Sequence, residues 1–151
     1  MKVIFLDIDG VLNSRRYDLT RGGDDGNIDK TRLPLLKEIV DKTGAKIVLS
    51  TTWRTNWDKD ESKLTEKGKE LRSTLLEYGL EIYDKTPDID LNERPKEIMA
   101  WLEKNEVDGF VIIDDTFGGW GELEKRLIKT SYYSGRGLEE SHVQGAIELL
   151  K

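Results

Sequence analysis

Residues 3–13 read Val-Ile-Phe-Leu-Asp-Ile-Asp-Gly-Val-Leu-Asn, an apolar run that ends in two carboxylates and a glycine. Residues two apart on an extended strand point to the same side, so Asp7 and Asp9 are expected to converge on one point. Gly10 then allows the backbone to turn away. Two like charges this close are unfavourable unless a cation lies between them. The segment therefore predicts a divalent-metal site at the carboxyl end of a buried strand.

Apolar runs alternate with helical patterns along the whole chain. The expected strands are residues 2–7, 46–50, 80–83, 109–114 and 127–131. Helical spacing of apolar residues marks 32–43, 71–78, 94–105 and 139–150. This alternation predicts an α/β fold, a three-layer sandwich whose central parallel sheet is covered on both faces. Ligands of such folds bind beyond the carboxyl ends of the strands, where Asp7, Ser50 and Asp114 all fall.

Length and composition favour one soluble domain, expected to span residues 1–151. No apolar run approaches the ~20 residues of a membrane span and no signal peptide precedes the first strand, so a cytoplasmic location is expected. The chain has no cysteine, which excludes disulfides, thiolate metal sites and cysteine nucleophiles. A net charge of −6 disfavours a broad electrostatic surface for nucleic acid but allows a local basic patch.

Four motifs, in this order and spacing, resemble those of the haloacid dehalogenase (HAD) superfamily of phosphotransferases. Residues 7–12, Asp-Ile-Asp-Gly-Val-Leu, are similar to the first motif, and residues 46–54, Lys-Ile-Val-Leu-Ser-Thr-Thr-Trp-Arg, to the second. Residues 94–98, Arg-Pro-Lys-Glu-Ile, open a helix where the family keeps the cation of its third motif. Residues 110–115, an apolar run ending in two aspartates, match the fourth. The resemblance implies a HAD-like Rossmannoid sheet with the first strand in the middle, between the strands of the second and fourth motifs.

The resemblance also implies a phosphomonoester hydrolase and names its catalytic groups. Asp7 would be the nucleophile and form an aspartyl-phosphate that water later cleaves. Asp9 would protonate the leaving oxygen and then deprotonate the water, and its backbone carbonyl is a metal ligand in the family. Ser50 would donate its hydroxyl to a phosphoryl oxygen, helped by the amide of Thr51.

The expected cofactor is Mg²⁺, a hard ion that takes oxygen ligands. Asp7 and one acid of the late pair would hold it. In relatives with two adjacent acids the second more often touches the ion, so Asp115 is the expected ligand and Asp114 would orient the neighbouring cation. That cation is either Arg94 or Lys96: Arg94 fits by its place at the helix start, whereas the family more often has lysine.

The chain has no room for the large cap domain that many HAD proteins insert after the first or second motif. A capless, open site is therefore expected, similar to the polynucleotide 3′-phosphatase domain, with residues 14–29 as either a lid or a mobile loop. Specificity would then come from nearby loops or from a substrate large enough to cover the site. Runs like Ser50-x-x-Trp53-Arg54 also occur in small HAD proteins grouped with nucleic-acid repair.

Two kinds of substrate stay open. A basic rim and aromatic side chains next to the first two motifs could hold a nucleic-acid 3′-phosphate end. The candidate contacts are Arg15, Arg16, Arg21, Arg54, Tyr17, Trp53 and Trp57. The acidic net charge favours instead a nucleotide or another small phosphate ester.

Other functions fit the motifs less well. The dehalogenase reaction needs neither a metal nor an acid at the position of Asp9. A receiver domain keeps its paired acids on the first strand, whereas here the pair lies late, and a non-catalytic metal-binding module would usually have lost a motif. The acidic run 22–26 reads as a flexible loop rather than a calcium site, because its glycines leave too few ligands. His142 reads as a solvated helix residue with no catalytic role.

Overall fold

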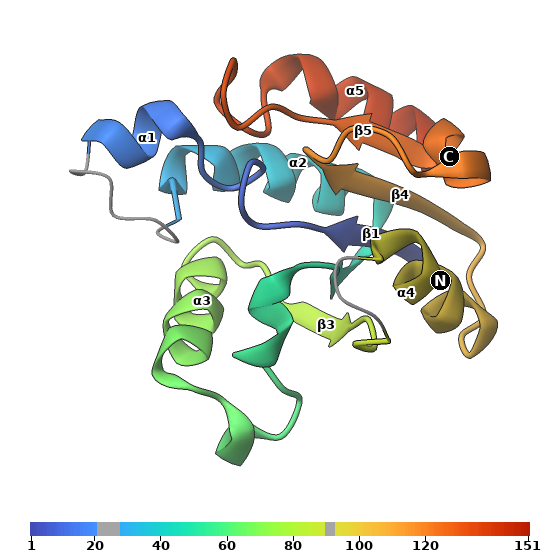
Figure 1. Ribbon diagram of the computed structural model, residues 1–151. Helices are drawn as coiled ribbons and strands as arrows, with labels where there is room; N and C mark the ends of the chain where they lie inside the picture. Colours follow the sequence, from blue (N-terminus) through green and yellow to red (C-terminus); the bar gives the residue numbers. More distant parts are fainter. Residues whose placement is uncertain (21–27, 90–92) are drawn as a thin grey trace.

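A single parallel sheet organises the chain. The computed structural model describes residues 1–20, 28–89 and 93–151 (Figure 1). Its strands are β1 (Lys2–Leu6), β2 (Lys46–Leu49), β3 (Ile82–Lys85), β4 (Gly109–Asp114) and β5 (Leu127–Lys129). They lie in the order β3-β2-β1-β4-β5, and each neighbouring pair is parallel. The expected central place of the first strand, between the second-motif and fourth-motif strands, is confirmed.

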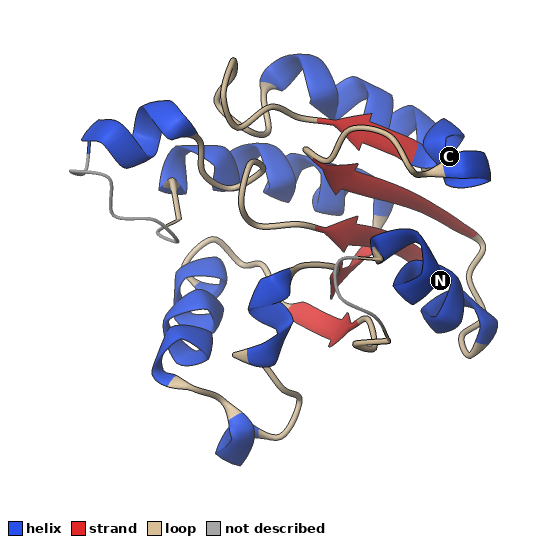
Figure 2. Cartoon of the chain, in the orientation of Figure 1, coloured by secondary structure: helices blue, strands red, loops and turns tan. Residues whose placement is uncertain are grey.

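Helices connect the strands and cover the sheet (Figure 2). They are α1 (Arg15–Thr20), α2 (Leu33–Thr43), α3 (Glu66–Leu76), α4 (Arg94–Glu103) and α5 (Glu140–Leu149). Short 3₁₀ segments are η1 (Lys30–Arg32), η2 (Thr52–Thr55), η3 (Glu61–Lys63) and η4 (Gly121–Arg126). Within residues 14–29, the segment expected to be a lid or a mobile loop, the described part after Asn13 contains the helix α1. Its six residues bury only Asp18, so no apolar periodicity announces it.

The central strand contributes to two separate cores, as a sheet covered on both faces requires. Ile4 and Leu6 pack into the core formed with α2, α3 and α5. Val3 and Phe5 point to the other face and pack into a smaller core with α4 and η4. All four side chains are fully buried. The predicted three-layer α/β architecture is therefore confirmed.

Backbone hydrogen bonds continue past the strand ends and align the motif residues. The amide of Asp7 donates to the carbonyl of Ile113 over 3.0 Å, and the amide of Ser50 donates to the carbonyl of Leu6 over 2.9 Å. The residues just after β1, β2 and β4 therefore meet at one edge of the sheet. No helix within the described ranges is long and apolar enough to cross a membrane.

Phe5 supplies a test of the smaller core. Its ring packs edge-on against Trp101 and Phe110, with centroids 5.5 and 5.7 Å apart. Phe5→Ala is expected to lower the free energy of unfolding by about 3–5 kcal/mol, measured by urea denaturation, because it leaves a cavity. Leu76→Ala, at a side chain that is 51% exposed, is the control and should change it by about 0.5 kcal/mol or less. Equal stabilities of the two variants would contradict this description of the core.

Candidate active site

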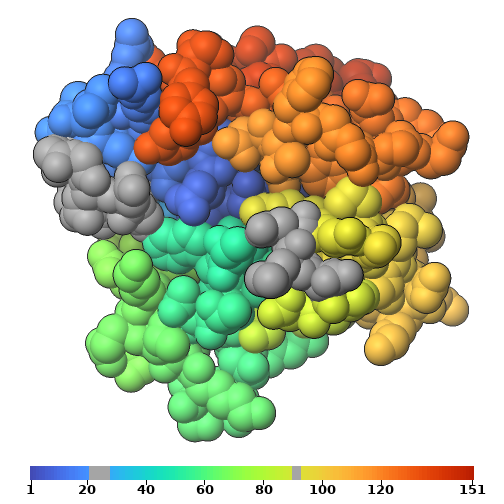
Figure 3. Space-filling model, in the orientation of Figure 1, coloured from blue at the N-terminus to red at the C-terminus, as the bar shows by residue number. Residues whose placement is uncertain are grey.

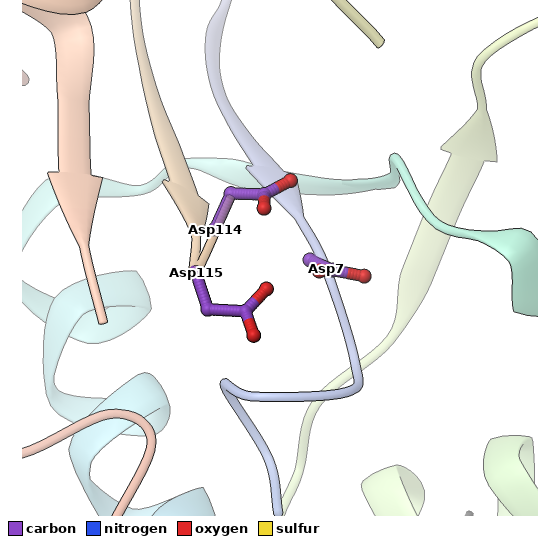
Figure 4. A group of neighbouring side chains, drawn as sticks. All are labelled: Asp7, Asp114 and Asp115. Carbon is purple, nitrogen blue, oxygen red and sulfur yellow. The ribbon is translucent and has the colours of Figure 1, made fainter. Parts of the chain in front are cut away.

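Three carboxylates gather at the carboxyl edge of the sheet. Asp7 follows β1, Asp114 ends β4 and Asp115 comes next; one oxygen from each lies within 4.8 Å of the others (Figure 4). Asp7 is 2% exposed and Asp114 is fully buried, whereas Asp115 is partly exposed. The parallel pairing of β1 with β4 brings them together from distant parts of the sequence.

Arg94, the first residue of α4, reaches this cluster. Its Nη1 lies 3.0 Å from Asp7 Oδ1 and 3.2 Å from Asp114 Oδ2, and it donates to the backbone carbonyl of Ser50 over 2.6 Å. The other candidate, Lys96, has an exposed side chain and pairs with Glu93 at 2.6 Å. The structure therefore places Arg94, and not Lys96, at the cluster.

The cluster carries more negative charge than its one arginine balances. Burial raises the pKa of Asp7 well above the usual carboxyl value, and the nearby Asp114 raises it further, against the opposing effect of Arg94. Burial and Asp114 also raise the pKa of Asp115. Carboxylates crowded in this way provide the hard oxygen ligands that Mg²⁺ prefers. The residues present therefore fit a magnesium ion.

The backbone of Gly10 packs directly against the side chain of Asp115. A Cβ at this position would lie 2.1 Å from Asp115 Oδ2, and Gly10 has a φ of +84°. Only glycine adopts this conformation easily and also leaves space for the carboxylate. Thr130 Oγ1 donates to the carbonyl of Gly10 over 2.6 Å and holds the turn in place.

Asp9 lies on a turn and not on the strand. β1 ends at Leu6, and the amides of Val11 and Leu12 both donate to the carbonyl of Ile8, so the predicted extended geometry for Asp7 and Asp9 is wrong. The tight turn nevertheless leaves both carboxylates facing one hollow.

Two donors orient the exposed carboxylate of Asp9. Asn13 Nδ2 donates to Oδ1 over 2.9 Å, and Trp53 Nε1 donates to Oδ2 over 3.2 Å. Asn13 Oδ1 in turn accepts from the amide of Gly10 over 2.9 Å. Asn13 and the indole of Trp53 therefore fix the position of Asp9, a role that the sequence did not predict for either.

Ser50 presents a buried hydroxyl to which residues 1–20, 28–89 and 93–151 offer no hydrogen-bond partner. The residue is 1% exposed, and its Oγ has no hydrogen-bond partner within the described parts of the chain. A buried hydroxyl without a partner is unfavourable, and a ligand oxygen would satisfy it. The neighbouring Thr51 side chain instead caps η2, where its Oγ1 accepts from the amide of Trp53 over 3.3 Å.

A hollow of about 610 Å³ opens in front of Asp7, Asp115 and Arg94; Ser50 lies behind these residues and is not part of its lining. In Figure 3 the blue segment after β1 reaches the surface here, between the orange chain after β5 and the teal chain after β2. The hollow is lined by Asp7, Asp9, Asp18, Thr52, Trp53, Asn56, Lys67, Arg94, Asp115, Tyr132 and Tyr133. Sequence reasoning missed Tyr132 and Tyr133, although their place just past the carboxyl end of a predicted strand could have indicated them.

The chain also matches a known family over nearly its whole length. The family model for the HAD domain in Swiss Army Knife RNA repair proteins covers residues 3–143, which include all four motifs. This chain belongs to that HAD family. Comparison with curated proteins and with solved structures gives no match.

Arg54 of this HAD domain does not face the hollow, contrary to its predicted contact with substrate. It is 7% exposed, and its Nη2 lies 2.6 Å from Glu97 Oε2 and 3.1 Å from Asp88 Oδ1. The physical reason is the fully buried carboxylate of Glu97, which needs a cation beside it. Trp57 is 5% exposed in the larger core, so it is not available to stack on a base.

Of the other predicted substrate contacts, some lie near the hollow, one does not, and one lies outside the described residues. Arg15 and Arg16 are exposed at the start of α1, where the amide of Arg15 donates to the carbonyl of Tyr132 over 2.9 Å, beside the hollow. The hydroxyl of Tyr17 donates to the carbonyl of Ile28, and the ring is not part of the hollow. Arg21, the acidic run 22–26 and much of the proposed lid lie outside the described residues.

His142 is a capping residue and not a simply solvated one. Its Nδ1 accepts from the amide of Glu139 over 2.9 Å, in a capping box at the start of α5. Burial lowers the pKa of this imidazole, which favours the neutral form that the hydrogen bond requires.

Gly10 allows a test of the metal site. Gly10→Ala should displace Asp115, so the rise in melting temperature caused by Mg²⁺ should fall to a small fraction of the wild-type rise. Gly44→Ala is the matched control: Gly44 has a φ of +71° but nothing within 4 Å of an added Cβ. It should lower the melting temperature and leave the rise with Mg²⁺ intact. A full response to Mg²⁺ in Gly10→Ala would show that this contact does not shape the site.

Proposed function

We propose that residues 1–151 form one catalytic domain, a Mg²⁺-dependent phosphomonoesterase that acts on phosphate ends of nucleic acid through an aspartyl-phosphate on Asp7. The observation that carries the proposal is the meeting of three groups at one edge of the sheet. They are a buried nucleophile candidate in a carboxylate cluster, the guanidinium of Arg94, and the hydroxyl of Ser50, which is unpartnered among the described residues. Membership of a HAD family described for RNA repair proteins supports it.

Asp7 and Asp115 would hold the magnesium ion, together with the backbone carbonyl of Asp9. Asp114 is engaged differently, because its Oδ2 accepts from Arg94 and its Oδ1 from the amide of Thr116 over 2.8 Å. It would therefore chiefly orient Arg94. Bound Mg²⁺ would supply positive charge for the phosphoryl oxygens and keep Asp7 ionised.

The first chemical step would be attack by a carboxylate oxygen of Asp7 on phosphorus. A bond forms between that oxygen and phosphorus as the bond to the ester oxygen breaks. Arg94 and the hydroxyl of Ser50 would bind the phosphoryl oxygens and stabilise their charge in the transition state. Since the Ser50 hydroxyl has no partner among the described residues, it can donate to a phosphoryl oxygen without breaking a hydrogen bond there.

Asp9 would move the proton in both steps. It would protonate the leaving oxygen, and then take a proton from the water that cleaves the aspartyl-phosphate. The bonds from Asn13 and Trp53 hold its carboxylate at the mouth of the hollow, where a leaving group has to lie. This position supports an acid–base role rather than a role as a carboxylate ligand of the metal.

The hollow supports a nucleoside leaving group. Trp53 and Tyr133 offer aromatic surface beside Asp9, and Tyr133 is 79% exposed. Lys67 Nζ lies 5.8 Å from the centre of the Trp53 ring and could contact a further phosphate. Arg15 and Arg16 are exposed at the start of α1, where the backbone of Arg15 contacts Tyr132 of the hollow, and would add positive charge near it. Base stacking combined with scattered cations is typical of single-strand binding.

The test is hydrolysis of an aryl phosphate with Mg²⁺. Asp7→Asn is expected to lower kcat by about 10³-fold or more, because it removes the nucleophile, and a chelator should abolish wild-type activity. Asp41→Asn, at an exposed acid on α2, is the control and should keep full activity. Equal rates in wild type and Asp7→Asn would exclude the proposed reaction.

The same assay distinguishes the two substrate classes. A 3′-phosphorylated oligonucleotide should give a kcat/KM at least about 10-fold above that of the matching nucleoside monophosphate, since each stacked base adds about 1–3 kcal/mol. Equal values for the two would favour a small phosphate ester as the substrate.

A further inference from the structure

We propose that Arg54 and Glu97 are positioning residues: their buried ion pair keeps Arg94 on the carboxylate cluster, and neither touches substrate. The inference rests on the proposed phosphatase function and adds two residues to it. It replaces the sequence-based expectation that Arg54 binds substrate.

Arg54 is held by contacts within the protein. Its Nη1 donates to the carbonyl of Thr51 over 3.0 Å, and its Nη2 lies 2.6 Å from Glu97 Oε2. It is not among the residues that line the hollow. A second acid, Asp88, lies 3.1 Å away, but its side chain is 62% exposed and water screens it. Glu97 is therefore the main partner of Arg54.

Glu97 lies one helical turn after Arg94 on α4. Residues three apart on a helix are neighbours on its surface, so α4 presents a cation and an anion side by side to the chain after β2. The carboxylate is fully buried, and burial raises its pKa while Arg54 opposes that effect. The amide of Ile89, which donates to Glu97 Oε2 over 3.4 Å, also opposes it, and Arg94 does so more weakly. Arg94 carries a positive charge one turn away on the same helix, so it is the cation to which this buried acid would turn without Arg54.

The two arginines hold consecutive carbonyls of the second motif. Arg94 donates to the carbonyl of Ser50 over 2.6 Å, and Arg54 donates to that of Thr51 over 3.0 Å. Arg54 in turn binds α4 through Glu97, so α4 is fastened to this chain segment at two neighbouring points. Lys85 adds to the support, because its Nζ donates to the carbonyl of Arg54 over 3.0 Å.

These contacts assign each of the two arginines to different buried acids. Arg54 neutralises Glu97, and Arg94 is then free of that acid and faces Asp7 and Asp114. If Arg54 loses its charge, Glu97 competes for Arg94 and draws it from the phosphoryl site. A displacement of about 1 Å is enough to lower a rate by about 100-fold.

Kinetics of Arg54→Met, Glu97→Gln, Arg94→Met and their combinations test the inference on the aryl phosphate. Arg54→Met is expected to lower kcat by about 10–100-fold and to leave KM within about 2-fold. Arg54→Met with Glu97→Gln should recover most of kcat, because no buried anion then competes for Arg94. Adding Arg54→Met to Arg94→Met should cause no further loss, since residues that act through one another are not additive.

Three results would overturn the inference. A higher KM that the second change does not rescue would indicate direct contact between Arg54 and substrate. Independent losses from Arg54→Met and Arg94→Met would indicate a merely structural role. Unchanged kcat in a folded Arg54→Met would show that Arg94 needs no such support. If Arg54→Met does not fold, Arg54→Gln, which also removes the charge, replaces it, alone and with Glu97→Gln. Arg54→Lys, which keeps the charge, is the control and should retain most of kcat.

A crystal structure of Arg54→Met, or of Arg54→Gln if the first does not fold, gives a readout that does not depend on turnover. The guanidinium of Arg94 is expected to turn from Asp7 toward Glu97 in Arg54→Met and to keep its place in Arg54→Lys. An unmoved Arg94 in Arg54→Met would contradict the inference. If the wild type has no phosphatase activity but Arg94 is displaced in Arg54→Met, the phosphatase function is refuted and the positioning role stands.

Discussion

Repulsion among Asp7, Asp114 and Asp115, only partly balanced by Arg94, is the constraint on which the rest of this edge of the sheet depends. The parallel pairing of β1 with β4 brings these carboxylates close together. Gly10 has no Cβ, the atom that would clash with Asp115. A protein would not gain stability from such a cluster alone. Its three carboxylates instead fit a metal cation.

The surroundings of the cluster form a graded arrangement of charge. Buried acids lie at the centre, Arg94 bridges two of them, and Asp9 stands exposed at the mouth of the hollow. Behind Arg94, Arg54 pairs with Glu97, a further buried acid that lies outside the carboxylate cluster. In the proposed reaction the buried acids and Arg94 bind the metal and the phosphoryl group, and Asp9 transfers the proton. The pair of Arg54 and Glu97 positions Arg94.

The fold and the carboxylate cluster could largely be predicted from the sequence. Apolar runs that end in acids mark both the strands and the edge of the sheet where those acids meet. The place of β1 between β2 and β4 followed from the family resemblance, and the three-layer fold from the alternation of strand and helix patterns. The turn at Asp9 could not be predicted, because Asp7-x-Asp9 is equally compatible with an extended strand and with the hydrogen-bonded turn that forms.

The burial of Arg54 was equally hidden, since it depends on Glu97, 43 residues away in the sequence. Arg54 next to a motif reads as a substrate contact until a buried partner is seen. Tyr132 and Tyr133 were missed for a related reason: they follow β5, which carries no motif. Local pattern reveals which residues end a strand, but not which partner a charged side chain finds across the fold.

The stability of the metal-free protein as a function of pH tests the central claim most directly. Since the pKa of Asp7 is raised in the folded protein, the folded state retains this proton to a higher pH than the unfolded chain does. The free energy of unfolding of wild type, relative to Asp7→Asn, should therefore fall as the pH rises above the usual carboxyl range, and Mg²⁺ should restore it in wild type alone. A difference between the two proteins that changes neither with pH nor with Mg²⁺ would contradict the account.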